Sequence, residues 1–276
     1  MLNFINKTLI QQNKKAFEQL TFFLKIDLKK LKIVSASVFG SAAIIDTSEH
    51  YNDIDIIAYS DIFCRENAKK MISLIKDIKG FFYDKSPIFI EDAIAPRIEF
   101  FIKFQNVKFD INIFPNKLCG IEEIETNVLH DSVDLVIGSM NKYNIVLFGK
   151  TNFESLINKE FTPFYSDNIR ELRLKMLEGR IYNLIEVIEK QIINNEFGYI
   201  FYLFKMRNYF IKWLFIYYKK YPFDYSKHLK FQLTKLLALN KEDIDTILLI
   251  ADNTLTYNAK RFISLVKKYL ITKEVK

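Results

Sequence analysis

The sequence predicts an α+β fold in two parts, a first part that mixes helices with a small β-sheet and a second part made only of helices. Two observations support this organisation. Runs in which apolar and polar residues alternate, as they do in half-buried strands, occur only before Lys150. Beyond it, apolar residues recur at helical spacing. We therefore expect one domain at residues 1–150 and a second at residues 151–276.

The first part contains helices that alternate with single strands or pairs of strands. In chain order, the expected elements are a helix at 4–24, strands at 33–39 and 53–59, a helix at 61–79, strands at 97–104 and 107–114, a helix at 121–140 and a strand at 144–148. Gln105 and Asn106 separate the two longest alternating runs, which indicates a β-hairpin. If that turn has two residues, Phe101 lies opposite Asp110, and Glu99 is the diagonal neighbour of Asp110 on the same face.

The second part is expected to contain five helices. Ser166 caps the first, which runs to about Asn194, and the second ends before Pro222. Asn240 and Asp243 resemble a capping box at the start of the fourth. The third and fifth helices are expected at 226–239 and about 258–271.

The acidic residues of the predicted strands are the most informative feature of the chain. Asp53 and Asp55 are separated by one apolar residue, so both point to the same face of their strand. Acids this close repel each other unless a cation lies between them, and hard divalent ions such as Mg²⁺ prefer carboxylate oxygens. A third acid, Asp110, lies between apolar neighbours in a later strand. The three aspartates together predict a Mg²⁺ site.

A Gly40-Ser41 pair directly follows the strand expected at 33–39. Such a turn offers backbone N–H groups and a hydroxyl at which phosphate groups can bind. Together with the three aspartates, it indicates metal-assisted transfer of a phosphoryl or nucleotidyl group.

The order of these motifs resembles the nucleotidyltransferase superfamily typified by DNA polymerase beta. The shared pattern is an apolar strand followed by Gly-Ser, an Asp-apolar-Asp-apolar strand after a loop, and a later apolar-Asp-apolar strand, within roughly residues 30–150. The residues that match it are Gly40, Ser41, Asp53, Asp55 and Asp110. The resemblance implies a small mixed β-sheet flanked by helices. One departure is the loop before Asp53, which lacks the glycine that many members carry soon after the Gly-Ser pair.

The resemblance also implies the chemistry. Asp53 and Asp55 would hold two Mg²⁺ ions, with Asp110 completing the catalytic one. The Gly40-Ser41 turn would hold the β- and γ-phosphates of the nucleotide. An acceptor hydroxyl would attack the α-phosphorus in line and release pyrophosphate. ATP is the default donor because it is abundant, and another nucleoside triphosphate fits the same residues.

The general base that takes the acceptor's proton is expected to be Asp110 itself or Glu99. Glu99 lies on the face of Asp110 in the expected hairpin, where it would either act as the base or bind a cationic acceptor. The alternative is a purely structural role, in which Glu99 forms an ion pair with Arg97 or Lys108.

A catalytic part followed by a helical part is the layout of the antibiotic nucleotidyltransferases that act on aminoglycosides and lincosamides. In these enzymes the helical part forms one wall of the substrate cleft. Arg207 lies on the apolar face of its helix and needs an anionic partner, which is either a structural carboxylate or the nucleotide triphosphate. Lys227 and Lys230 would project together and are phosphate candidates, with ordinary surface lysines as the alternative.

Several acceptors stay open. The first choice is a small hydroxylated antibiotic of the aminoglycoside kind, because the helical part is short for tracking along RNA. A protein side-chain hydroxyl or an RNA 3′ end, as in toxin-type enzymes, comes next. A different class of function is a catalytically idle binding partner, such as an antitoxin that retains the fold. Three retained acids that repel one another argue against an idle site.

The composition sets limits on other functions. The formal net charge is +7, from 40 basic and 33 acidic residues spread along the chain, which suits a nucleotide partner but does not indicate nucleic acid. The two cysteines, Cys64 and Cys119, form neither a zinc motif nor a disulfide framework. The sequence shows no signal peptide and no membrane span, so we expect a cytoplasmic protein without membrane contact.

Overall fold

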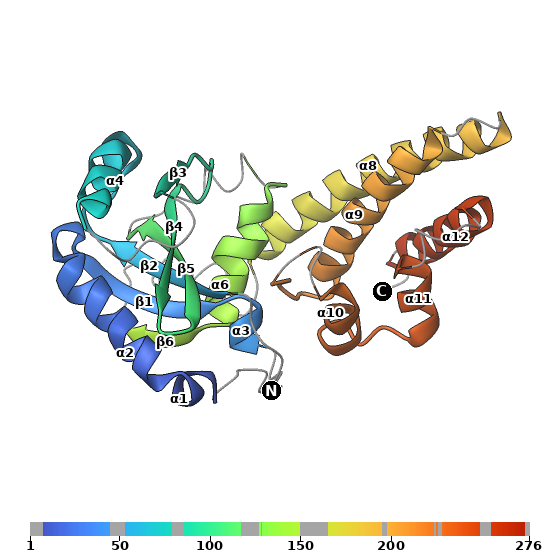
Figure 1. Ribbon diagram of the computed structural model, residues 1–276. Helices are drawn as coiled ribbons and strands as arrows, with labels where there is room; N and C mark the ends of the chain where they lie inside the picture. The colour runs from blue at the N-terminus through green and yellow to red at the C-terminus, as the bar shows by residue number, and fades with distance from the viewer. Residues whose placement is uncertain are drawn as a thin grey trace. The chain divides into compact units, whose positions relative to one another are not determined.

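The fold is α+β, with a mixed β-sheet and helices followed by a helical region (Figure 1). The chain divides into two compact units, Met1–Pro163 and Phe164–Lys276. The boundary expected at residue 150 falls at the edge of a stretch, 150–164, that lies outside the described residues. The computed structural model describes residues 8–44, 53–78, 86–116, 127, 129–149, 165–194, 198–223, 225, 228–248 and 255–273.

Within the described residues of the first unit, six strands form one sheet in the order β3-β4-β5-β2-β1-β6. The strands are β1 (Ile33–Phe39), β2 (Ile54–Ser60), β3 (Ile88–Ile90), β4 (Arg97–Phe104), β5 (Val107–Pro115) and β6 (Ile145–Phe148). All neighbours pair antiparallel except β2 and β5, which are parallel, and the sheet is therefore mixed. Five of the six strands match the expected runs to within one residue at each end, and β3 was not predicted.

The expected hairpin is confirmed in its register. Gln105 and Asn106 form the turn between β4 and β5, and Gln105 adopts a positive φ of 55°. Phe101 lies opposite Asp110, and Glu99 lies opposite Asn112. Because side chains alternate along a strand, Glu99 and Asp110 project from the same face of the sheet.

One face of this sheet is apolar and carries the core of the unit. The helix α2 (Lys14–Phe22) and the π-helical turn η1 (Phe23–Asp27) supply rings that pack on it. Phe17 contacts Phe109 edge-to-face with ring centroids 5.4 Å apart, and Phe23 contacts Phe100 in the same way at 6.4 Å. All four rings are buried, and burial of each contributes about 1.5–3 kcal/mol. The polar residues of the central strands therefore project from the opposite face.

Residues 4–7, 79, 121–126 and 128 of the expected helices lie outside the described residues. Within the described part of the first unit, the helices are shorter than the sequence predicts. They are α1 (Leu9–Gln12), α2, η1, η2 (Lys29–Leu31), α3 (Ser41–Ile44), η3 (Arg65–Asn67), α4 (Ala68–Lys76), η4 (Val133–Gly138) and α6 (Ser139–Lys142). The helix expected at 61–79 starts late, because the hydroxyl of Ser60 accepts hydrogen bonds from the N–H groups of Ile62 and Phe63 and holds a turn there. The helix expected at 4–24 is interrupted at Asn13, whose side chain donates to the carbonyl of Leu9.

Within its described residues, the second unit consists of helices. They are α8 (Asp167–Ile193), α9 (Tyr199–Tyr217), α10 (Leu229–Lys235), α11 (Lys241–Leu248) and α12 (Leu255–Lys273). Ser166 caps α8 by accepting a hydrogen bond from the N–H of Ile169, as expected. At the start of α11, Asn240 Oδ1 accepts a hydrogen bond from the N–H of Asp243, as expected of a cap. The return bond of the expected capping box differs, because Asp243 Oδ2 accepts from the side-chain Nδ2 of Asn240. No helix among the described residues combines the length and the apolar character needed to cross a membrane.

Candidate active site

The turn after β1 brings the backbone of Gly40 against the carboxylate of Asp55. Phe39, the last residue of β1, pairs with Asp55 in β2, and Gly40 follows with a φ of +74°. A Cβ at Gly40 would collide with Asp55 Oδ2, so the carboxylate of Asp55 would have to move. Glycine is therefore required here both for the left-handed backbone and for the space that Asp55 occupies. Ser41 is the first residue of α3, and the contact expected of its hydroxyl lies outside the described residues.

Parallel pairing of β2 with β5 places two of the predicted acids side by side. Asp55 and Asp110 are register partners, so their side chains project from the same face of neighbouring strands. Asp53 precedes β2, alternates with Asp55 and is exposed to solvent. Glu99 projects from the same face on β4. The sheet thus brings together the four acids that the sequence singled out.

The pKa of Asp110 depends on its burial and on the neighbouring acids. Burial is the largest of the causes that raise the pKa of Asp110 to about 7. Three neighbouring acids act in the same direction, in the order Asp55, Glu99 and Asp53, and the guanidinium of Arg97 opposes them. Metal-free Asp110 therefore changes its charge near neutral pH. Among the described residues, no group of three or more His, Cys, Asp or Glu side chains is arranged closely enough to hold a metal ion as it stands.

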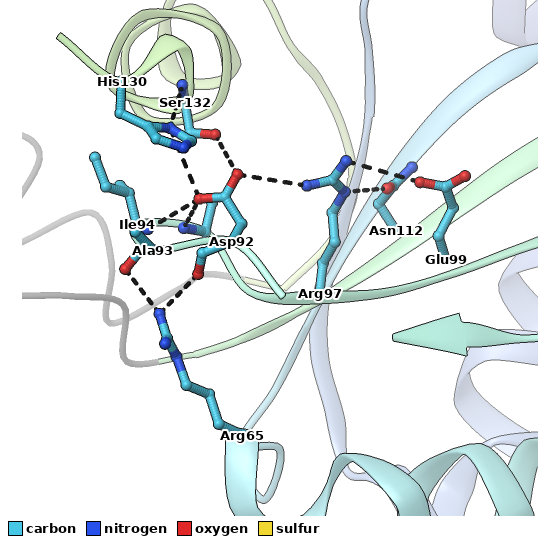
Figure 2. A network of polar contacts seen from close by, with 10 residues as sticks. Arg65, Asp92, Ala93, Ile94, Arg97, Glu99, Asn112, His130 and Ser132 are labelled. Atoms are coloured by element: carbon cyan, nitrogen blue, oxygen red, sulfur yellow. Dashed lines mark hydrogen bonds and ion pairs between the residues drawn. The ribbon is translucent and has the colours of Figure 1, made fainter. Parts of the chain in front are cut away.

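Arg97 and Asn112, which the sequence did not assign to the site, contact its acids, and Figure 2 shows Arg97 beside Asn112 and Glu99. Asn112 Nδ2 donates to Asp110 Oδ1 at 3.0 Å, and Arg97 Nε donates to Asn112 Oδ1 at 3.0 Å. Arg97 Nη2 lies 3.8 Å from Glu99 Oε2, so the ion pair considered as an alternative role for Glu99 is present. Asn112 alternates with Asp110 along β5, which is the one sequence signal that could have found it.

Asp92, in the loop between β3 and β4, anchors the far side of Arg97. Its Oδ2 lies 3.9 Å from Arg97 Nη1 and accepts a hydrogen bond of 2.6 Å from the Ser132 hydroxyl. Its Oδ1 accepts hydrogen bonds from the N–H groups of Ile94 and Ala95 at 2.9 and 2.8 Å. Burial alone would raise the pKa of Asp92, but these hydrogen bonds outweigh it and hold the pKa below its ordinary value.

Two further residues hold the Asp92 loop in place. Arg65 Nη2 donates to the main-chain carbonyls of Asp92 and Ala93, both at 2.7 Å. His130 Nδ1 lies 3.9 Å from Asp92 Oδ1. Figure 2 shows these contacts meeting at Asp92 and continuing through Arg97 toward Glu99 and Asn112. The loop is therefore joined to the acids by side-chain contacts that sequence spacing does not reveal.

Three residues of the helical unit, Arg207, Lys227 and Lys230, are predicted to contact the phosphate groups of the nucleotide. Arg207 is half-buried on α9, where its Nε donates to the carbonyl of Ile247 at 2.8 Å, and burial lowers its pKa. Lys230 is exposed on α10, and Lys227 lies outside the described residues. Binding of a nucleotide by these three residues stays a prediction.

Comparison with known proteins gives little further guidance. Neither a protein-family model nor a curated protein matches the chain. Among solved structures, the fold is similar to a nucleotidyltransferase-like protein from Exiguobacterium sibiricum 255-15, with 7% sequence identity and a TM-score of 0.43. The match covers 95% of this chain and 75% of that chain. Similarity at this level is too low to support a function, which is therefore inferred below from the site residues.

Replacing Gly40 by alanine is expected to destabilise the protein by about 1–3 kcal/mol, because the φ is left-handed and the new Cβ collides with Asp55. The free energy of unfolding in urea measures the change. Gly179→Ala on α8 is the matched control, since nothing lies within 4 Å of its added Cβ. That control is expected to stabilise the protein by up to about 1 kcal/mol. Equal effects at the two positions would contradict the close approach of Gly40 to Asp55.

Asp110→Asn is expected to stabilise the metal-free protein at high pH. The pKa of Asp110 is raised to about 7 in the folded state, so the folded wild type loses stability as pH rises from about 4 to about 7. At pH 8 with a chelator, the variant should be more stable by about 1–4 kcal/mol, and the difference should vanish below pH ~4. Urea unfolding across this range measures it.

Asp92→Asn should show the opposite sign, because the folded-state pKa of Asp92 is lowered. The ionised Asp92 stabilises the fold above its unfolded pKa, and this contribution is lost as pH falls through the lowered folded-state pKa. The variant should therefore be less stable than the wild type at pH 8, with a gap that narrows in acid. If the stability difference from the wild type changed with pH in the same direction for both variants, the different surroundings of Asp110 and Asp92 would be contradicted.

Proposed function

We propose that this chain is a Mg²⁺-dependent nucleotidyltransferase. It moves a nucleoside monophosphate, by default AMP from ATP, onto a hydroxyl of a small molecule such as an aminoglycoside-like antibiotic and releases pyrophosphate. The observation that carries the proposal is the pairing of Asp55 with Asp110 on parallel strands. Asp53 and Glu99 lie near enough to raise the pKa of Asp110, and Gly40 leaves the space that the carboxylate of Asp55 occupies.

The chemistry of the site residues suits a divalent metal ion. Asp53, Asp55 and Asp110 offer hard carboxylate oxygens, and their negative charges favour an open arrangement that a cation would draw together. These three side chains would hold two Mg²⁺ ions. When bound, the ions would neutralise phosphate charge and lower the pKa of the acceptor hydroxyl.

The chain's own residues supply the remaining functions. The backbone N–H groups of the Gly40-Ser41 turn would hold the β- and γ-phosphates of the nucleotide beside Asp55. The acceptor oxygen forms a bond to the α-phosphorus, the bond from that phosphorus to the bridging oxygen breaks, and pyrophosphate leaves. The acceptor's proton passes to a carboxylate oxygen of Asp110 or Glu99. Arg97 Nη2 lies 3.8 Å from Glu99 Oε2, so the Glu99 carboxylate is paired with a positive charge.

Transfer of label from α-³²P nucleoside triphosphates tests the proposal. The purified protein is incubated with Mg²⁺ and, separately, with aminoglycosides, total RNA or proteins from a lysate. We expect label on the small molecule, and Asp55→Asn and Asp110→Asn to lower the rate by at least about 100-fold. Asp77→Asn, an exposed residue at the end of α4, is the matched control and should transfer label at the wild-type rate.

The other outcomes separate the alternatives. Label on RNA or on protein would support nucleotidyl transfer but contradict a small molecule as the acceptor. Transfer that is unaffected by Asp55→Asn and Asp110→Asn would overturn the assignment of the site. Absence of transfer to every acceptor, together with absence of divalent-ion binding, would favour an idle binding partner.

A further inference from the structure

We propose that Arg97 and Asn112 are positioning residues that orient the carboxylate of Asp110 for metal binding, and that Asp92 anchors them. This inference rests on the function proposed above and assigns a role to residues that contact the site without being metal ligands. It depends on a continuous series of side-chain contacts from the β3–β4 loop through Arg97 to Asn112 (Figure 2), and from Asn112 to Asp110.

Asn112 fixes the orientation of the Asp110 carboxylate. The two residues alternate on β5, and Asn112 Nδ2 donates to Asp110 Oδ1 at 3.0 Å. A carboxylate rotates freely unless a donor holds one of its oxygens. With Oδ1 held by the amide, Oδ2 of Asp110 has a defined direction, as hydrogen-bond partners define it for metal-binding carboxylates.

Arg97 fixes the orientation of the Asn112 side-chain amide. A side-chain amide has a donor end and an acceptor end, and the wrong end would present an oxygen to the oxygen of Asp110. Arg97 Nε donates to Asn112 Oδ1 at 3.0 Å, which selects the orientation with the NH₂ group toward Asp110. Removal of Arg97 would therefore release the amide even though Arg97 does not bond to Asp110 itself.

Arg97 is in turn fixed from both sides. Its side chain is 23% exposed and lies between Glu99, at 3.8 Å, and Asp92, at 3.9 Å. The carboxylate of Asp92 is 11% exposed and is held by the Ser132 hydroxyl and two backbone N–H groups. An arginine with its guanidinium engaged in this way is suited to hold a neighbour and poorly suited to bind a substrate phosphate.

If Arg97 acted only through its positive charge, its effect on metal binding would be opposite to that of a positioning residue. Its positive charge lies close enough to oppose the raised pKa of Asp110. A cation beside four acids repels a second cation, so loss of its charge alone would tighten the binding of a divalent ion. Positioning through Asn112 predicts weaker binding. The sign of the change therefore distinguishes the two roles.

Titration with Mn²⁺ alone, followed by the EPR signal of the free ion, measures this sign. Arg97→Gln and Asn112→Ala are each expected to weaken Mn²⁺ binding about 10–100-fold, the usual effect of removing a residue that holds a metal ligand in place. Lys103→Gln is the matched control, because it removes a positive charge from the same face of β4 at an exposed position. The control should change the affinity by less than about twofold, since an exposed charge is screened by solvent.

The double variant tests whether Arg97 acts through Asn112. If it does, Arg97→Gln in the Asn112→Ala background should weaken Mn²⁺ binding no further. Arg97→Lys, which keeps the charge but loses the Nε donor, should weaken binding as Arg97→Gln does. In transfer assays, both Arg97 variants should lower kcat with little change in KM for the nucleotide. Thermal unfolding of each variant verifies that it is folded.

The outcomes that would overturn the inference are distinct. Tighter or unchanged Mn²⁺ binding by Arg97→Gln would leave Arg97 as a purely electrostatic or structural residue. Additive losses in the double variant would show that Arg97 does not act through Asn112. Wild-type protein that binds no Mn²⁺ would overturn the proposed function, and the positioning role with it.

Discussion

The parallel pairing of β2 with β5 is the constraint on which the site depends. These strands lie in the middle of the sheet, and both bury alternate residues on the face covered by α2 and η1. A slip of one residue would turn Asp55 or Asp110 into the core and an isoleucine toward solvent, at a large cost in free energy. The packing of Phe17 and Phe23 on one face therefore decides that the acids meet on the other.

The same register concentrates like charges, which opposes folding. Burial first, and then the neighbouring acids, raise the pKa of Asp110, so the folded protein disfavours the ionised form that the unfolded chain adopts freely. A sheet with a large apolar face can tolerate such a site, and sites that work with ligands are often strained in this way. Arg97 relieves part of the repulsion, while its hydrogen bond to Asn112 gives it a second, directional effect.

Local signals predicted most elements, and their failures have local causes. The β4–β5 hairpin followed from two alternating runs joined by a two-residue turn, where register depends only on neighbouring residues. β3 was missed because three residues, Ile88–Ile90, are too few to show an alternation. The late start of the helix after Ser60 depends on a hydroxyl that bonds to the backbone of the next residues, which helical periodicity does not report.

The sequence by itself determined the candidate acids and Gly40, because alternation along a strand and the chemistry of carboxylates are properties of short segments. It also identified Glu99 as a neighbour of Asp110 through the hairpin. Only the tertiary structure decided that β2 lies parallel to β5, and that Ser132 and Arg65 hold Asp92. These contacts join segments far apart in the chain, and the folded core selects them when it buries the apolar face of the sheet.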